Sequence, residues 1–246
     1  MPFITAGDPS LEATGKLVQR FDELGCHICE IGIPYSDPIA DGPVIQASYT
    51  RALDRGITVD GILSTLDKSN QQVTLPTVTM VSYSIVYRIG LETYIDRAIA
   101  SGVSGMIVPD LPVEEASGLS KFCRERDFSL IQLVTPTTTR ERARKILDTS
   151  TGFIYYVSVT GITGERTELP PDIVDNVEWL RENGDLPVCI GFGISEPEHV
   201  KMLAPHSDGL IVGSAIVRRI ADFSGDETEM ITRISSYIEE MLSALP

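Results

Sequence analysis

The sequence lacks any uninterrupted run of 18 apolar residues, the length at which a segment becomes a candidate transmembrane helix. Its first residues also lack the charged and apolar regions of a secretory signal peptide. Basic residues are scarce: 20 Lys and Arg against 35 Asp and Glu give a formal net charge of −15. This charge disfavours the basic surface that nucleic acid binding needs. We therefore expect a soluble, cytoplasmic protein that binds neither a membrane nor nucleic acid.

Cysteine and histidine are also few, and their spacing argues against a metal site. A chain of 246 residues can bury a sizeable core without disulfides, so we expect its 4 cysteines to be reduced. Cys26 and Cys29 have the C-x-x-C spacing of redox pairs, but they lead into an apolar strand and no second pair completes a zinc site. The 3 histidines have no metal-ligand spacing, and no P-loop or dinucleotide fingerprint is present.

Short apolar segments alternate with longer amphipathic stretches along the whole chain, which is typical of βαβ units around a parallel sheet. Strands are predicted at residues 2–5, 27–33, 76–82, 105–108, 129–134, 152–158, 187–191 and 209–212. Helical patterns cover residues 9–24, 113–126, 139–149, 171–182, 196–204 and 226–244. This alternation predicts an α/β fold: a single-domain (β/α)8 TIM barrel of eight parallel strands over residues 1–246. A doubly wound open sheet is the alternative, but it would need fewer strands.

An acidic segment, CEIGIPYSDPIADGPVIQ, covers residues 29–46 at the end of the second predicted strand. It places Glu30 inside an otherwise apolar strand, where a carboxylate is costly unless it is paired or functional. No predicted strand holds a Lys or Arg to pair with it, so we favour a functional role. Asp37 and Asp41 follow in a proline-rich loop, where aspartate often caps a turn or helix. We favour that structural role for Asp37 and leave both roles open for Asp41.

Glycine-rich turns follow the later strands. IGFGIS (190–195) and IVGSAI (211–216) each join a strand to a helix where barrels often bind phosphate through backbone N–H groups. Ordinary turns are the alternative, but two of them at these positions favour phosphate. SVTGITGERTELP (158–170) fits either a mobile lid or a surface loop. In PDLPVEE (109–115), Asp110 is interpreted as the end of a strand, and Pro112 lies near the start of a helix.

Six motifs together resemble the tryptophan synthase alpha subunits in order and spacing: PFITAGDP, EIGIPYSDPIADGPVIQ, PDLPVEE, YYVSVTGITG, GFGIS and GSAIV. The resemblance covers almost the whole chain. It implies a lyase of tryptophan biosynthesis that splits indole-3-glycerol phosphate into indole and glyceraldehyde 3-phosphate by a retro-aldol reaction. It also implies an alpha2beta2 assembly, in which this chain needs no cofactor and the beta subunit carries pyridoxal phosphate and receives indole through a tunnel.

The same resemblance implies roles for individual residues. Glu30 would be the catalytic acid and base, and Asp41 would accept a hydrogen bond from the indole N–H. Thr163 would be the lid residue that contacts Asp41. The further substrate and phosphate contacts would be Phe3, Tyr155, Gly164, Phe192, Gly193, Gly213 and Ser214.

Two features depart from the family pattern. The family has a short helix before the first strand, whereas this sequence begins almost inside that strand. After the third strand the family commonly reads Tyr-Tyr-Asn-Pro, where this chain has Ser82-Tyr83-Ser84-Ile85. These departures keep two alternatives open: a stand-alone lyase that releases free indole, and a barrel that acts mainly as an allosteric partner.

Overall fold

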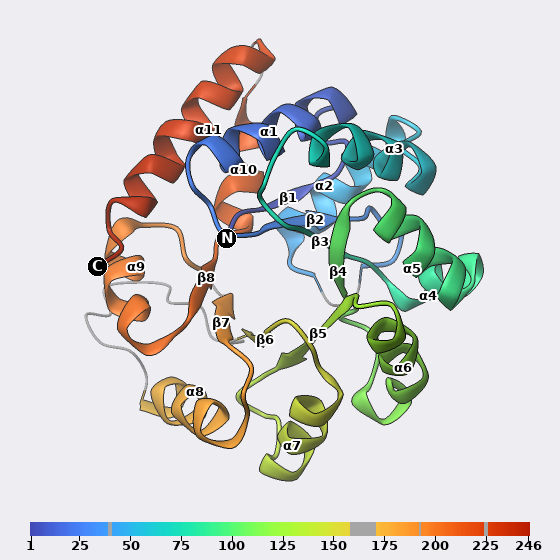
Figure 1. Ribbon diagram of the computed structural model, residues 1–246. Helices are drawn as coiled ribbons and strands as arrows, with labels where there is room; N and C mark the ends of the chain where they lie inside the picture. Colours follow the sequence, from blue (N-terminus) through green and yellow to red (C-terminus); the bar gives the residue numbers. More distant parts are fainter. Residues whose placement is uncertain (39–40, 158–170, 192, 224–225) are drawn as a thin grey trace.

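The computed structural model describes the chain except residues 39–40, 158–170, 192 and 224–225, and its strands form a closed parallel barrel (Figure 1). The strands, in chain order around the barrel, are β1 (Phe3–Thr5), β2 (Cys29–Gly32), β3 (Thr77–Met80), β4 (Val103–Ile107), β5 (Ser129–Val134), β6 (Ile154–Val157), β7 (Val188–Gly191) and β8 (Gly209–Ile211). A parallel bridge between Pro2 and Val212 joins the last strand to the first. Two backbone hydrogen bonds of 2.9 Å, from Phe3 to Val212 and from Val212 to Met1, complete this closure. The (β/α)8 prediction is confirmed.

Helices surround the barrel and include every helix predicted from the sequence. They are α1 (Leu11–Glu23), α2 (Pro43–Asp54), α3 (Val59–Asn70), α4 (Tyr83–Ile89), α5 (Leu91–Ala100), α6 (Ser117–Glu125), α7 (Arg140–Thr149), α8 (Pro171–Asn183), α9 (Pro197–Leu203), α10 (Ser214–Asp222) and α11 (Glu227–Leu242), with single 3-10 turns η1 (Val113–Glu115) and η2 (Ala204–His206). The sequence analysis did not assign α3, α4 or α5. Gly90 separates α4 from α5 with a φ of 98°, a conformation that glycine adopts without strain.

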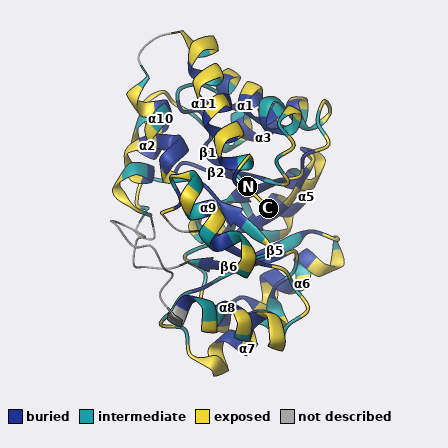
Figure 2. Ribbon diagram, turned by 90° about the vertical axis from the view of Figure 1, so that its left-hand side faces the viewer, coloured by how far each residue is buried: buried dark blue, intermediate teal, exposed yellow. Residues whose placement is uncertain are grey.

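Side chains alternate between two apolar layers, because successive residues of a strand point to opposite faces. Outward side chains such as Ile4 and Ile31 pack under the helices in the larger core. Inward side chains such as Val78 and Ile107 fill the barrel interior. Figure 2 shows this pattern as buried strands enclosed by helices with exposed outer faces. Glu30 lies between the outward Cys29 and Ile31, so its carboxylate faces the barrel interior.

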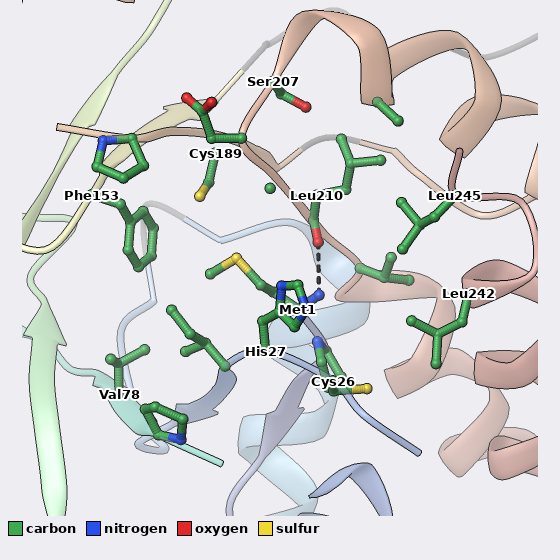
Figure 3. A pocket seen from close by; sticks show the side chains of 18 of the residues that line it. Met1, Cys26, His27, Val78, Phe153, Cys189, Ser207, Leu210, Leu242 and Leu245 are labelled. Carbon is green, nitrogen blue, oxygen red and sulfur yellow. Dashed lines mark hydrogen bonds between the residues drawn. The ribbon is translucent and has the colours of Figure 1, made fainter. Parts of the chain in front are cut away.

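The amino ends of the strands surround an apolar pocket of about 620 Å³ (Figure 3). Val78 and Cys189 line it from strands, Phe153 lines it from just before β6, and Leu242 and Leu245 line it from the carboxyl-terminal segment. The four cysteines are free thiols, as predicted. This pocket lies at the opposite end of the barrel from the loops that follow the strands. Catalytic chemistry is expected at that other end, where TIM-barrel active sites lie.

None of the helices in the described part of the chain has both the length and the apolar character needed to cross a membrane.

Candidate active site

Glu30 is the most unusual buried group in the barrel. Its exposed fraction is 0%, and strand register places it beside Phe3 on β1 and Val78 on β3. Neither carboxylate oxygen has a hydrogen-bond partner among the described residues. Burial disfavours the charged form and raises the pKa of Glu30 from 4.5 to about 8, against a smaller opposing effect of the amino terminus. At neutral pH the side chain therefore holds a proton that it can deliver and take back.

Asp41 lies in the loop between β2 and α2, at the carboxyl end of the strand that carries Glu30. Its N–H donates to the carbonyl of Pro38 at 3.2 Å, and Gln46 donates to the carbonyl of Asp41 at 2.7 Å. Gly42, not Asp41, is the N-cap of α2, so the helix-capping alternative for Asp41 is wrong. Burial, followed by the nearby negative charge of Asp110, raises the pKa of Asp41 from 3.8 to about 6. Asp41 is therefore ionised at neutral pH, where Glu30 is mostly protonated.

Two buried polar contacts fix α2 against the end of β1. The hydroxyls of Thr5 and Ser48 lie 2.6 Å apart. Asp8, which is 2% exposed, accepts two hydrogen bonds from the guanidinium of Arg51, a geometry that combines charge with direction. These contacts hold α2 at both the end of β1 and the loop that follows it. They therefore also fix the position of the middle turn of α2, whose inward face points to the barrel.

That inward face brings Tyr49 into the site, which the sequence analysis missed. Tyr49 is 3% exposed and lines a small cavity of about 30 Å³ together with Asp41 and Asp110. Its hydroxyl lies 2.9 Å from the position that a Cβ on Gly32 would occupy, two residues beyond Glu30 on the same face of β2. Burial and then the charges of Asp41 and Glu30 raise its pKa well above the usual value. The tyrosine hydroxyl thus remains a hydrogen-bond donor in the field of both carboxylates.

Asp110 is the second missed residue. β4 ends at Ile107, so Asp110 lies beyond the strand rather than at its end. Its carboxylate accepts hydrogen bonds from the Ser82 hydroxyl at 2.7 Å and the Tyr83 N–H at 2.8 Å. Ser82, the first residue that departs from the family pattern, therefore serves as the N-cap of α4 and ties the loop after β3 to the loop after β4. Asp110 also lines the cavity beside Asp41.

Phe3 and Tyr155 bring aromatic surface to the same space. Phe3 pairs with Glu30 in register, and its ring lies close to Gly32, where any side chain would collide with it. Tyr155 lies on β6, and a Cβ on Gly191 would overlap its ring. Burial and then the charges of Glu30 and Asp41 raise the pKa of Tyr155 well above its usual value. Both predicted contact residues are thus brought together with the carboxylates.

The turns after β7 and β8 form the remaining part of the predicted site. Gly193 has a φ of 56°, which favours glycine at this position. Gly213 is the N-cap of α10, no side chain caps this helix, and Ser214 is its exposed first residue. Uncapped N–H groups at a helix start can bind an anion. Three predicted residues, Thr163, Gly164 and Phe192, lie outside the described residues.

The described residues contain no group of three His, Cys, Asp or Glu side chains that could hold a metal ion.

Known proteins similar to this chain point to one family. The family model described as tryptophan synthase alpha chain matches residues 1–246. The Rhodopirellula baltica tryptophan synthase alpha chain is 60% identical over 225 residues, which cover 90% of this chain and 81% of that protein. The Synechocystis protein of the same name is 41% identical over 246 residues, covering 100% of this chain and 92% of its own length.

Solved structures agree with these sequence matches. A chain from the tryptophan synthase a2b2 complex of Pyrococcus furiosus superposes with a TM-score of 0.91 at 36% identity, covering 98% of this chain and 96% of that one. The tryptophan synthase subunit alpha of Legionella pneumophila superposes with a TM-score of 0.90 at 32% identity, covering 99% and 91%.

Proposed function

The chain belongs to the tryptophan synthase alpha chain family, and from this premise we propose that Glu30 and Asp41 catalyse the cleavage of indole-3-glycerol phosphate. The products are indole and glyceraldehyde 3-phosphate, which makes the protein a carbon–carbon lyase. One observation carries the assignment of roles: Glu30 is fully buried inside the barrel with neither oxygen bonded to a described residue, and Asp41 lies in the loop that follows the same strand. Their different surroundings raise the two pKa values to about 8 and about 6. Such a pair provides one proton carrier and one group that stays ionised.

Glu30 carries the proton through the reaction. Its protonated carboxyl donates to the indole carbon that bears the glycerol chain, which leaves a carboxylate and a positively charged ring. The carboxylate then accepts the proton of the adjacent glycerol hydroxyl as the carbon–carbon bond breaks. The bond electrons return to the ring to give indole, and the hydroxyl oxygen becomes the aldehyde carbonyl. Glu30 ends protonated, as it began, and its burial and raised pKa support this cycle.

Asp41 stabilises the charge that appears on the ring. As an anion it accepts a hydrogen bond from the indole N–H, and this bond strengthens when the ring becomes positive. Its pKa of about 6 keeps it ionised at neutral pH. The Tyr49 hydroxyl, which lies beside Gly32 on the inward face of β2, would donate a hydrogen bond to the substrate. Phe3 and Tyr155 give the indole ring aromatic surfaces to pack against.

The phosphate end of the substrate would lie at the turns after β7 and β8, of which the second is close to Phe3. Backbone N–H groups near Gly193, Gly213 and Ser214 would hold it, since the start of α10 is free of side-chain caps. The family resemblance adds Gly164 and Phe192 to these contacts, and it assigns to Thr163 a hydrogen bond to Asp41 on substrate binding.

The partner in this proposal is a tryptophan synthase beta subunit. Solved structures similar to this chain include subunits of an alpha2beta2 complex. The chain itself would use no cofactor, whereas the beta subunit would hold pyridoxal phosphate and consume the indole.

Indole release from indole-3-glycerol phosphate tests the proposal directly. The purified chain should release indole slowly alone and many times faster with a beta subunit, and Glu30→Gln should abolish release in both cases while the far-ultraviolet circular dichroism stays unchanged. Strong release that the beta subunit does not change would favour the stand-alone lyase. No release under either condition, or normal release by the variant, would overturn the assignment.

A further inference from the structure

A side chain from the last helix reaches the turn that contains Gly193. Tyr237 lies on α11, which packs beside α9 and α10 (Figure 1). It is 6% exposed, and its hydroxyl donates a hydrogen bond of 3.0 Å to the carbonyl of Ser195. Ser195 is two residues after Gly193. The last helix is thus bonded directly to the backbone of the turn after β7.

The same tyrosine also reaches the turn after β8, through Arg219. The guanidinium carbon of Arg219 lies 3.6 Å from the centre of the Tyr237 ring, a cation–π contact. Arg219 in turn donates a hydrogen bond of 3.0 Å to the carbonyl of Ala215, in the first turn of α10. Ala215 follows Gly213 by two residues. One aromatic side chain therefore contacts the turn after β7 directly and the first turn of α10, just beyond Gly213, through Arg219.

Neither contact depends on a proton that is lost near neutral pH. Burial raises the pKa of Tyr237 to about 12, although the nearby Arg219 lowers it, so the hydroxyl stays a donor. The N–H of Ser195 donates to Nδ1 of His199 on α9 at 3.2 Å. The peptide groups of Ser195 are thus held from two sides, by α9 and by α11.

We propose that Tyr237 is a positioning residue for the phosphate end of the substrate, and that with Arg219 it sets the spacing of the two glycine turns. This proposal rests on the proposed function, because it takes the phosphate to lie between these turns. Hydrogen bonds form only within a few tenths of an ångström, so an anion held by N–H groups from two loops is sensitive to their spacing. Tyr237 lies behind the turns, so its effect falls on phosphate binding and not on bond cleavage.

Tyr237→Phe removes the hydroxyl and keeps the ring over Arg219. We expect the dissociation constant for glycerol 3-phosphate, measured by calorimetry, to rise about fivefold, which corresponds to one neutral hydrogen bond of about 1 kcal/mol. The dissociation constant for 3-indolepropanol, which has no phosphate, should stay unchanged. For indole-3-glycerol phosphate, KM should rise by a similar factor while kcat changes little. Arg219→Met, which keeps an apolar stem under the ring but loses the bond to Ala215, should shift the same constants in the same direction.

Tyr94→Phe is the matched control. Tyr94 is also buried, and its hydroxyl also makes one hydrogen bond of 3.0 Å, to Thr79 on β3, but it lies on α5 away from both turns. It should lower the melting temperature without changing the affinity for either ligand. The inference is overturned if Tyr237→Phe leaves glycerol 3-phosphate binding unchanged or weakens both ligands equally. If the unmodified chain binds no glycerol 3-phosphate and releases no indole, the proposed function itself fails.

Discussion

Replacing Glu30 by glutamine should stabilise the protein by an amount that grows with pH. The side chain is fully buried, and burial raises its pKa from 4.5 to about 8. Above pH 4.5 the unfolded chain releases a proton that the folded chain keeps. Folding then takes up a proton, so the stability of the parent chain falls as pH rises from 4.5 to about 8. Glutamine is uncharged and nearly the same shape, so the variant avoids this loss.

The magnitude follows from the two pKa values. One pH unit corresponds to about 1.4 kcal/mol in the free energy of unfolding. The interval from 4.5 to about 8 therefore costs the parent chain about 5 kcal/mol when the pH exceeds 8. At pH 7 the cost is about 3 kcal/mol, and below pH 4.5 it vanishes. A typical domain is stable by only about 5–15 kcal/mol, so the difference is large enough to measure easily.

Urea unfolding at pH 5, 6, 7 and 8 provides the assay, with the difference between Glu30→Gln and the parent plotted against pH. We expect this difference to increase by about 1.4 kcal/mol per pH unit. Glu182→Gln, on the exposed surface of α8, is the control and should differ little from the parent at each pH. A difference for Glu30→Gln that stays constant with pH would refute the reasoning, because it would mean that the folded chain ionises this carboxyl as readily as the unfolded one.

Three further outcomes are expected in the indole-release assay. The pH profile of kcat/KM should be bell-shaped, falling below about pH 6 as Asp41 takes up a proton and above about pH 8 as Glu30 loses one. A kcat/KM that does not fall on either side of this range would contradict the assigned roles. Asp110→Asn removes a charge that raises the pKa of Asp41, so the acidic limb should move to lower pH, and an unmoved limb would show that burial alone sets it. Gly191→Ala adds a Cβ that overlaps the ring of Tyr155. It should reduce kcat/KM by about tenfold and the free energy of unfolding by about 1–3 kcal/mol. Unchanged kinetics would place that ring outside the site.

The barrel could be predicted from the sequence because its strands are marked by local signals. The segment around Ile31 and the segment around Leu210 are short, apolar and bounded by turns, and both became strands. The ends of strands could be predicted less precisely. β4 begins at Val103, two residues before the predicted start. The prediction began too late because Ser104 is polar, whereas in the structure it is an exposed residue within the strand. α3 was not assigned, although Thr58 caps it by accepting a hydrogen bond from Gly61.

Apart from the glycine turns and the family resemblance, the candidate site could be predicted only where a side chain conflicts with its surroundings. Glu30 stood out because a carboxylate interrupts an apolar strand. Tyr49 did not stand out, because Ile45, Tyr49 and Ala52 have the spacing of one buried helix face. An aromatic residue on such a face usually belongs to the core. Asp110 gave no signal of its own because its partners, Ser82 and Tyr83, are 28 and 27 residues away and meet it only in the fold.

The bridge between Pro2 and Val212 also determines when the enzyme can first work during its own synthesis. The ribosome produces Glu30 and Asp41 early, but the turn at Gly213 emerges more than 170 residues later. At about 5–20 residues per second, this interval lasts on the order of ten to forty seconds. Throughout it, β1 has only β2 as a neighbour, and its other edge is open to wrong partners. The nascent chain therefore carries Glu30 and Asp41 long before the proposed phosphate contacts exist, and closure of the barrel and completion of the proposed site are a single late event.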